Sequence, residues 1–396
     1  MSLQLRRIWL RAHLILGLTL GLLFALLGLT GSFLVFNHTV DEWLNPGLLL
    51  RSGPGPDRPL AAIARAAEAA TRDLTPAGRL LMPPRHPGGV YVVFTTVKVG
   101  DEYKLTEAHI DPASARVLGR RAWGEYFVSW IYVLHSHLHA GEAGETVVGL
   151  AGVGLTLSTA TGLVLWWPIV RRGGVRAAAR IKRAHLSYDL HKLAGSLAAV
   201  GLLVVALSGV YLVFPGWFHK PLAVVSTRTQ HAPVRSRPAA PGTPDVDLDV
   251  ALATARSSFP EARLIAVQLP LAPTDTITVT ARRPGEVRRT WGRCVVWVDR
   301  HTGAVLKVHD GNTQTAADVF AEWQFPLHNG EALGLPGRWL VLLTGLSPTL
   351  LGITGTALWW RKCRSKARQR AARATRGDRA ARVFPAGEPA DSMVRP

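Results

Sequence analysis

Four stretches of the chain are apolar over roughly twenty residues each, and each predicts a helix that crosses a membrane, because a bilayer core about 30 Å thick needs about 20 apolar residues in a helix. They cover residues 14–36, 147–169, 193–214 and 339–360. The first is too long for a signal peptide and has no clear small-residue cleavage site, so we expect it to remain as an uncleaved anchor.

The two long segments between spans have mixed helix-like and strand-like patterns. Residues 60–72 are helix-like and precede the strand-like YVVFTTV, and residues 248–258 are helix-like and precede TITVTARR and CVVWVD. Each segment is therefore expected to form one helix packed on a small antiparallel sheet. The predicted fold class is an α-helical membrane protein, with four transmembrane helices from a duplicated two-helix unit and two outer α+β domains.

The predicted segments cover the whole chain. In order they are an N-terminal segment 1–12, a first span 13–36, an outer domain 37–130, a second span with an outer extension 131–169, a loop 170–190, a third span 191–214, an outer domain 215–325, a fourth span with an outer extension 326–360, and a basic tail 361–396. The extended spans are longer than a bilayer core, so we expect breaks near Gly141, Gly144 and Pro336. The tail lacks apolar periodicity and is expected to be disordered.

The charge of the chain follows this topology. The sequence holds 46 Lys and Arg against 27 Asp and Glu, a net charge of +19, and so basic a balance first suggests nucleic acid. However, residues 1–12, 170–192 and 361–396 hold 21 of the basic residues and only four of the acidic ones. By the positive-inside rule these segments, and hence both termini, are expected to be cytoplasmic, with the two long domains facing outward. The basicity is explained by topology, and no nucleic-acid partner is expected.

The spans share a pattern at matched spacing. Each contains a histidine followed by a Thr-Gly or Ser-Gly pair: His13 with Thr30-Gly31, His191 with Ser208-Gly209, His135 with Thr161-Gly162, and His328 with Thr354-Gly355. The separation from histidine to glycine is 18 residues in the first and third spans, and 27 in the second and fourth. The match indicates an internal duplication whose halves have the same orientation, an arrangement known in membrane proteins.

The duplication selects four of the 14 histidines as candidate metal ligands. By the predicted topology His13 and His191 lie at the cytoplasmic ends of their spans, whereas His135 and His328 lie on the outer side. An ionisable residue at membrane depth is a functional candidate, and two imidazoles on facing helices can bind haem iron. We therefore predict two haem b groups, one for each pair, and no catalytic residue separable from these axial ligands.

Three further residues are weaker candidates for the cofactor sites. Gly17 and Gly195 lie one helical turn after His13 and His191 and would make room for a flat ring. His139 lies one turn from His135, although the fourth span has no counterpart of it. The histidines expected at the surface are His38, His86, His109, His185, His219, His231, His301 and His309.

Two other interpretations of the histidines are open. They could be interfacial side chains hydrogen-bonded to the backbone, or ligands of zinc or another divalent ion. The pairs lack the carboxylate and cysteine partners that such ions usually collect. The two cysteines, Cys294 and Cys363, form no CxxCH motif, so covalent c-type haem attachment is not expected.

The combined motifs resemble the PepSY-associated transmembrane family. They are TGLVLWWP in the second span, HKLAG and SGVYLVF in the third, and LHNGEALG and TGTALWW in the fourth, and the resemblance covers residues 5–362. The outer segments are similar to PepSY domains, with DPASARVL and DRHTGAVL as closing strands. The family includes iron-regulated inner-membrane proteins and ferric-siderophore reductases of Gram-negative bacteria.

This resemblance implies a location and an activity. The location is the bacterial inner membrane, with the outer domains in the periplasm and His13, His135, His191 and His328 at the family's haem-ligand positions. The activity is reduction of a ferric siderophore or similar iron chelate on the periplasmic side, with electrons from an unknown cytoplasmic or membrane donor.

Two other functions compete with this activity. One is a non-enzymatic PepSY-domain protein that binds an envelope partner or aids siderophore or metal uptake. The other is a metal permease, which would need polar groups at mid-membrane. The spans offer only small hydroxyls there, such as Thr19, Ser158 and Ser196.

Overall fold

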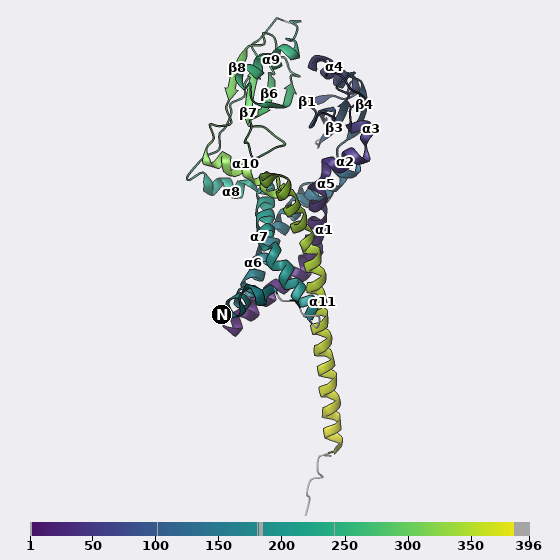
Figure 1. The fold of residues 1–396 in the computed structure, drawn as a ribbon, viewed down its shortest axis with the longest axis vertical. Coiled ribbons are helices and arrows are strands. Elements are labelled where there is room, and N and C mark those ends of the chain that lie inside the picture. Colours follow the sequence, from purple (N-terminus) through teal and green to yellow (C-terminus); the bar gives the residue numbers. More distant parts are fainter. Residues whose placement is uncertain (1, 101, 180, 182–184, 241, 384–396) are drawn as a thin grey trace, which may run out of the picture.

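The computed structural model describes residues 2–100, 102–179, 181, 185–240 and 242–383. Within these residues, four helices are long and apolar enough to cross a membrane. They are α1 (Leu3–Leu34), α6 (Gly141–Ala179), α7 (Leu186–Val213) and α11 (Gly334–Val383). Figure 1 shows them as a bundle below a β-sheet domain, as the hydropathy of the chain predicts.

The four helices form a ring in which α1 packs on α6 and α11, and α7 packs on the same two helices. Small residues allow the close approach: a Cβ atom placed on Gly28 would lie only 2.2 Å from the carbonyl oxygen of Gly345. Beside it the Ser32 hydroxyl donates to the Leu342 carbonyl at 2.8 Å. Such contacts are typical of helix packing in membranes, where water supplies no driving force.

The outer surface of the ring is apolar. Leu22 is 86% exposed, and Leu197 is 77% exposed. A helix that is hydrophobic on its exposed as well as its packed face is typical of a membrane span. We therefore regard this surface as the lipid-facing one.

The outer segments form one sheet of eight antiparallel strands within the described residues, rather than two separate sheets. The strands are β1 (Pro76–Met82), β2 (Tyr91–Val99), β3 (Glu102–Ile110), β4 (Val117–Ala122), β5 (Arg263–Leu269), β6 (Ile277–Arg282), β7 (Cys294–Val298) and β8 (Val305–His309). The order is β4-β3-β2-β1-β5-β6-β7-β8. Pairing of β1 with β5, in which Leu80 lies opposite Gln268, joins the two expected domains into one.

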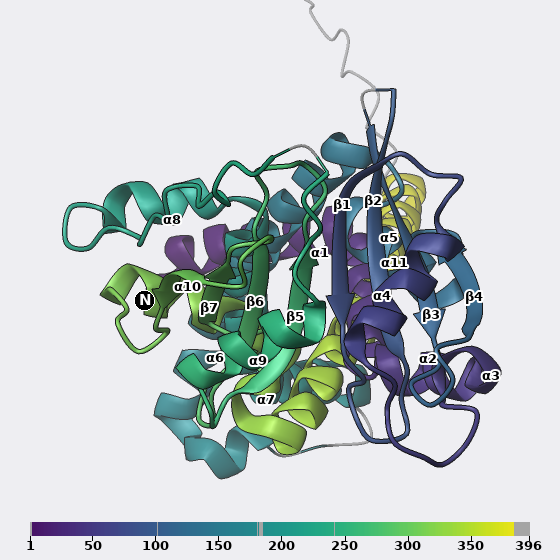
Figure 2. The ribbon, with the colours of Figure 1, turned by 90° about the horizontal axis from the view of Figure 1, so that it is seen from above.

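Two helices cover one face of this sheet. Figure 2 shows α4 (Leu60–Ala70) over the β1–β4 half and α9 (Leu248–Ser258) over the β5–β8 half. Ile63 and Ala67 of α4 and Ala251 of α9 are completely buried in a common core. The helix-plus-sheet composition of each half is as the sequence predicts, but the two halves share one hydrophobic core.

The two halves are also joined by a helix cap. The Asp249 carboxylate, in the first turn of α9, accepts from the backbone N–H groups of Leu60 (2.8 Å) and Ala61 (3.1 Å) at the start of α4. The first N–H groups of a helix have no partner within it, and a negative charge is favourable there. This contact joins the first turn of α9 to the first turn of α4.

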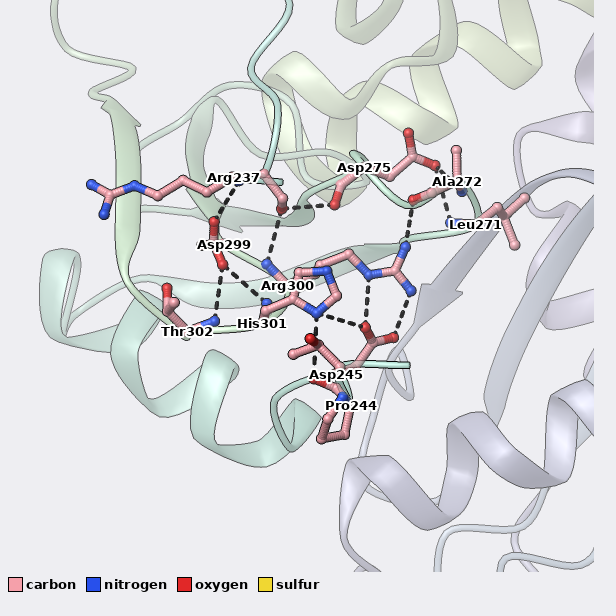
Figure 3. Close-up of polar contacts among 12 residues, drawn as sticks. Arg237, Pro244, Asp245, Leu271, Ala272, Asp275, Asp299, Arg300, His301 and Thr302 are labelled. Carbon is pink, nitrogen blue, oxygen red and sulfur yellow. Dashed lines mark hydrogen bonds and ion pairs between the residues drawn. The ribbon is translucent and has the colours of Figure 1, made fainter. Parts of the chain in front are cut away.

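An aspartate at the end of a strand anchors each half of the sheet. Asp111 follows β3 and accepts from the backbone N–H of Ser52 at 2.9 Å. Asp299 follows β7 and accepts from the N–H groups of Arg237 (2.8 Å) and His301 (3.0 Å), as Figure 3 shows. In both halves the carboxylate therefore ties the sheet to the segment that leads into its covering helix.

Short helices connect the sheet to the spans. They are α2 (Asn37–Leu44), α3 (Pro46–Leu49), α5 (Phe127–His137), α8 (Pro215–Leu222) and α10 (Ala316–Asn329). The helix before the second span breaks at Leu138 and His139, which have positive φ angles. The helix before the fourth span breaks at Gly330, with φ 84°, and a 3-10 turn at Glu331–Leu333. The expected breaks thus occur: the first includes Gly141, with φ 57°, and lies before Gly144, and the second ends at Gly334, two residues before Pro336.

The expectation of a disordered tail is wrong for residues 361–383, because α11 continues as a helix to Val383 (Figure 1). Residues 384–396 lie outside the described residues. Between the last span and Val383 the chain is rich in Ala, Arg, Lys and Gln, which have high helix propensity. Apolar periodicity reports packing of a helix against a core, so its absence did not reveal this helix, whose residues 361–372 are exposed.

Candidate functional site

The structure brings the rings of His13 of α1 and His191 of α7 close together across the helix bundle. Their ring centres are 6.1 Å apart and the ring planes are inclined by 85°. The two histidines come from helices on opposite sides of the four-helix ring. They form the first of two pairs, which we call the inner pair.

Each ring of the inner pair is held through Nδ1. His13 Nδ1 lies 3.0 Å from the Ser158 carbonyl oxygen and 3.0 Å from the Thr161 hydroxyl, both on α6. His191 Nδ1 lies 3.0 Å from the Thr354 hydroxyl on α11. A carbonyl oxygen can only accept, so the proton of His13 is on Nδ1 and the lone pair of Nε2 is available for a metal.

The outer pair consists of His135 on α5 and His328 on α10. Their ring centres are 6.2 Å apart, with planes inclined by 51°. His135 Nδ1 lies 3.0 Å from the Thr30 hydroxyl, and His328 Nδ1 lies 3.0 Å from the Val205 carbonyl and 3.2 Å from the Ser208 hydroxyl. As in the inner pair, the proton of His328 is on Nδ1, which leaves Nε2 free to bind.

The repeated Thr-Gly and Ser-Gly pairs pack against the histidine rings, and we call the glycine of each pair a glycine seat. A Cβ atom placed on each glycine would meet the Cε1 atom of a ring: 2.9 Å at Gly31 from His135, 3.2 Å at Gly162 from His13, 3.0 Å at Gly209 from His328, and 3.3 Å at Gly355 from His191. The hydroxyl of each pair contacts Nδ1 of the same ring. Sequence reasoning used these pairs only to recognise the repeat and missed this role, although their constant spacing to histidine was visible.

The separation of the rings suits one metal ion between two imidazoles. An imidazole nitrogen binds a first-row metal at about 2.0–2.1 Å, and the same nitrogen lies about 1.2 Å from the centre of its ring. Two imidazoles on opposite sides of one metal ion would therefore have ring centres about 6.4 Å apart. The observed 6.1 and 6.2 Å are close to this value. Among the described residues, no group of three or more His, Cys, Asp or Glu side chains could hold a metal ion. A structural zinc site needs four protein ligands, and each pair supplies two.

The weaker sequence candidates have different surroundings. A Cβ atom on Gly17 would meet nothing within 4 Å, and one on Gly195 would meet only Leu351, at 3.5 Å. His139 does not join the outer pair, because α5 ends at His137 and the chain turns there. Its Nε2 lies 3.1 Å from the Trp130 carbonyl, and its ring packs on the Trp130 indole at 4.6 Å.

One histidine expected at the surface is buried. His109 on β3 is completely buried, and its Nε2 lies 3.3 Å from Glu107. Arg121 on β4 forms an ion pair with Glu107 at 2.8 Å and with Asp41 of α2 at 2.7 Å. Burial raises the pKa of Glu107, but the contacts with His109 and Arg121 outweigh it and lower that pKa overall. This buried network joins the sheet to the short helix that follows α1.

The fold defines a multi-pass α-helical membrane protein with two histidine pairs and one sheet domain. A family model described as "PepSY-associated TM region" matches residues 10–362, and the chain belongs to this family. The match agrees with the resemblance seen in the sequence motifs. A comparison with curated proteins found no match.

Proposed function

We propose that this protein is a di-haem electron-transfer protein of the bacterial inner membrane that reduces ferric-siderophore iron on the periplasmic side and thereby releases ferrous iron. The observation that carries the proposal is the presence of two histidine pairs, each with the ring separation that one six-coordinate iron requires. Haem b at both pairs would supply one-electron chemistry at each end of the bundle.

The positions of the pairs support transfer across a membrane. His13 and Gly31 are 18 residues apart on α1, and Gly31 contacts His135 of the outer pair. Eighteen helical residues span about 27 Å, close to the thickness of a bilayer core, which is about 30 Å. The two pairs would therefore lie near opposite faces of the membrane.

The residues at the two pairs would have separate roles in binding iron and in orienting the histidine rings. The four histidines would bind iron through Nε2, while the hydroxyl and carbonyl groups at Nδ1 fix the ring orientation and the tautomer. Such hydrogen bonds to the outer nitrogen of a metal-bound histidine also raise its basicity. Gly17 and Gly195 leave the adjacent turns free of side chains, which would suit a flat ring beside the inner pair.

The charge distribution supports the orientation. Basic residues cluster before α1, between α6 and α7, and along the end of α11, which supports a cytoplasmic location for the inner pair and both termini. The sheet domain then lies in the periplasm, next to the outer pair. The substrate would be a ferric siderophore or similar iron chelate, reduced by electrons from a cytoplasmic or membrane donor.

Proteoliposomes test this function. The protein is reconstituted, a membrane-impermeant reductant is trapped inside, and a ferric chelate is added outside with a colorimetric ferrous chelator. We expect ferrous iron outside only when the protein is present. His191→Ala and His328→Ala should each abolish it, and the matched control His139→Ala should retain it. Equal rates in liposomes with and without protein would contradict the proposal.

A further inference from the structure

Arg288 is a cation without an anionic partner at the outer histidine pair. It lies in the connection between β6 and β7, and its guanidinium carbon is 4.8 Å from the centre of the Phe325 ring on α10. Its Nε atom is buried and has no hydrogen-bond partner, and no carboxylate of the described residues lies within 4.0 Å of its guanidinium. The residue as a whole is half-buried, and an anion would stabilise a partly desolvated charge of this kind.

The position of Arg288 is set by both ligand helices. Phe325 precedes His328 by three residues, and Tyr132 precedes His135 by three residues. Residues three apart lie on the same helix face, separated by about 4.5 Å along the axis. The charge of Arg288 also acts on Tyr132, where it opposes the burial that raises the pKa of the phenol. Arg288 therefore lies against the turn of α10 that precedes His328, and its charge reaches the turn of α5 that precedes His135.

The nearest acidic group does not neutralise this arginine. Glu322 on α10 is close enough to sense Arg288, but burial raises the pKa of its carboxyl, and its Oε1 atom is buried without a hydrogen-bond partner. Glu286, which precedes Arg288 by two residues, accepts from the N–H of Arg283 and contacts the Arg293 side chain. Glu286 is thus engaged by Arg283 and Arg293, whereas Glu322 senses the charge of Arg288 without forming an ion pair with it.

Two more arginines at this junction make no ion pair within the described residues. The Arg338 guanidinium lies 4.5 Å from the centre of the Phe36 ring, at the outer end of α1. An Nη atom of Arg289 lies 2.9 Å from where a Cβ of Gly334, the first residue of α11, would be. Three arginines without an ion pair among the described residues thus lie around this junction, together with the buried Glu331, which accepts from the backbone N–H of Arg289.

We propose that Arg288 binds a carboxylate group beside the outer histidine pair, an inference that rests on the proposed function. The planar guanidinium forms two parallel hydrogen bonds to a carboxylate, which suits this ligand better than a spherical anion. The carboxylate has two possible sources: a propionate of the porphyrin bound by His135 and His328, or a carboxylate of the iron chelate. Arg288 would act as a positioning residue in the first case and as a substrate-binding residue in the second.

Arg288→Gln in the full-length protein tests the inference, with Arg235→Gln as the matched control because Arg235 is an exposed arginine of the same domain. The first readout is a potentiometric titration of both haems without substrate. If the ligand is a propionate, loss of the positive charge makes one haem harder to reduce. A tenfold change in its reduction equilibrium corresponds to about 59 mV for one electron. Reconstitution with haem dimethyl ester, which has no free carboxylate, should then remove the difference between wild type and variant.

The second readout is binding of two ferric chelates, measured by quenching of tryptophan fluorescence. If the chelate supplies the carboxylate, Arg288→Gln weakens binding of ferric citrate at least tenfold and leaves binding of a ferric tris-hydroxamate unchanged, with unchanged haem potentials. Unchanged potentials together with unchanged ferric citrate binding would overturn the inference. The haem content of the wild-type protein reports separately on the proposed function, and the ferric citrate measurement can be made whether or not haem is present.

Discussion

At the scale of single residues, each histidine of the two pairs has the same surroundings although it comes from a different helix. A hydroxyl and, for His13 and His328, a backbone carbonyl hold Nδ1, and a glycine lies against Cε1. The paired arrangement was predictable from spacing, because duplicated residues occupy equivalent places. Which helix seats which histidine was not predictable, because it depends on the packing of α1 on α5 and of α7 on α10.

The glycine seats predict a site-specific loss of haem. In Gly31→Val the new side chain would occupy the place of the His135 ring, since even a Cβ atom would come within 2.9 Å of it. We expect haem content to fall from two to about one per chain, measured by the pyridine haemochrome assay. Gly21→Val is the control, because a Cβ atom there meets nothing within 4 Å. Two haems per chain in Gly31→Val would contradict this account of the seat.

The ring angles predict two distinguishable ferric haems. Imidazole planes near 85°, as in the inner pair, interact with different iron d orbitals and leave them nearly equal in energy, whereas the 51° of the outer pair separates them further. Electron paramagnetic resonance of His328→Ala, which keeps the inner pair, should show the more anisotropic low-spin signal. Identical signals from His328→Ala and His191→Ala would contradict the observed angles.

The Asp299 anchor predicts acid sensitivity of the sheet. Burial raises the pKa of this carboxyl, but the N–H groups that it accepts from outweigh burial and lower the pKa to about 2. An unfolded aspartate has a pKa of about 3.9, so the folded state gains about 2.6 kcal/mol above pH 4 and loses it as the pH falls from about 4 to about 2. Asp299→Asn should be less stable at neutral pH and show a flatter stability profile over this range. Denaturation followed by tryptophan fluorescence measures both, and an unchanged profile would contradict the role of Asp299.

At the scale of elements, the sequence reveals local patterns better than long-range pairing. The four spans and the helix-plus-strand order of each half follow from hydropathy and alternation. Joining the halves needs β1 to pair with β5, about 190 residues away along the chain, with Leu80 opposite Gln268. No local signal specifies that register, because it depends on the core that α4 and α9 build together. The buried position of His109 escaped prediction for the same reason.

The cap between α4 and α9 predicts a measurable coupling of the two halves. Asp249→Ala removes the acceptor for the N–H groups of Leu60 and Ala61. Loss of such a cap costs about 1 kcal/mol, which a denaturant titration of the full chain can resolve. Thr254→Ala is the control, because the half-buried Thr254 hydroxyl bonds only within α9, to the Val250 carbonyl, and we expect it to change stability by about a few tenths of a kcal/mol at most. Equal stability of Asp249→Ala and Thr254→Ala would show that the cap does not couple the halves.

At the scale of the whole molecule, the two histidine pairs lie at the two ends of one helix bundle, and the sheet domain lies beyond one end of that bundle (Figure 1). The net charge of +19 belongs largely to the segments at the other end. Charge therefore indicates the orientation of the protein, and the histidines indicate its chemistry. The exposed helix that ends α11 extends this basic region beyond the bundle.

The haem content of the purified wild-type protein tests the central claim most directly. If the proposed function is right, we expect two b-type haems per chain, with the low-spin absorption bands of bis-imidazole ligation in both oxidation states. The proposed function also predicts about one haem per chain in His191→Ala and in His328→Ala, and two in the control His139→Ala. A protein that folds and inserts in the membrane but binds no haem, or one whose haem content is unchanged in His191→Ala and His328→Ala, would contradict it.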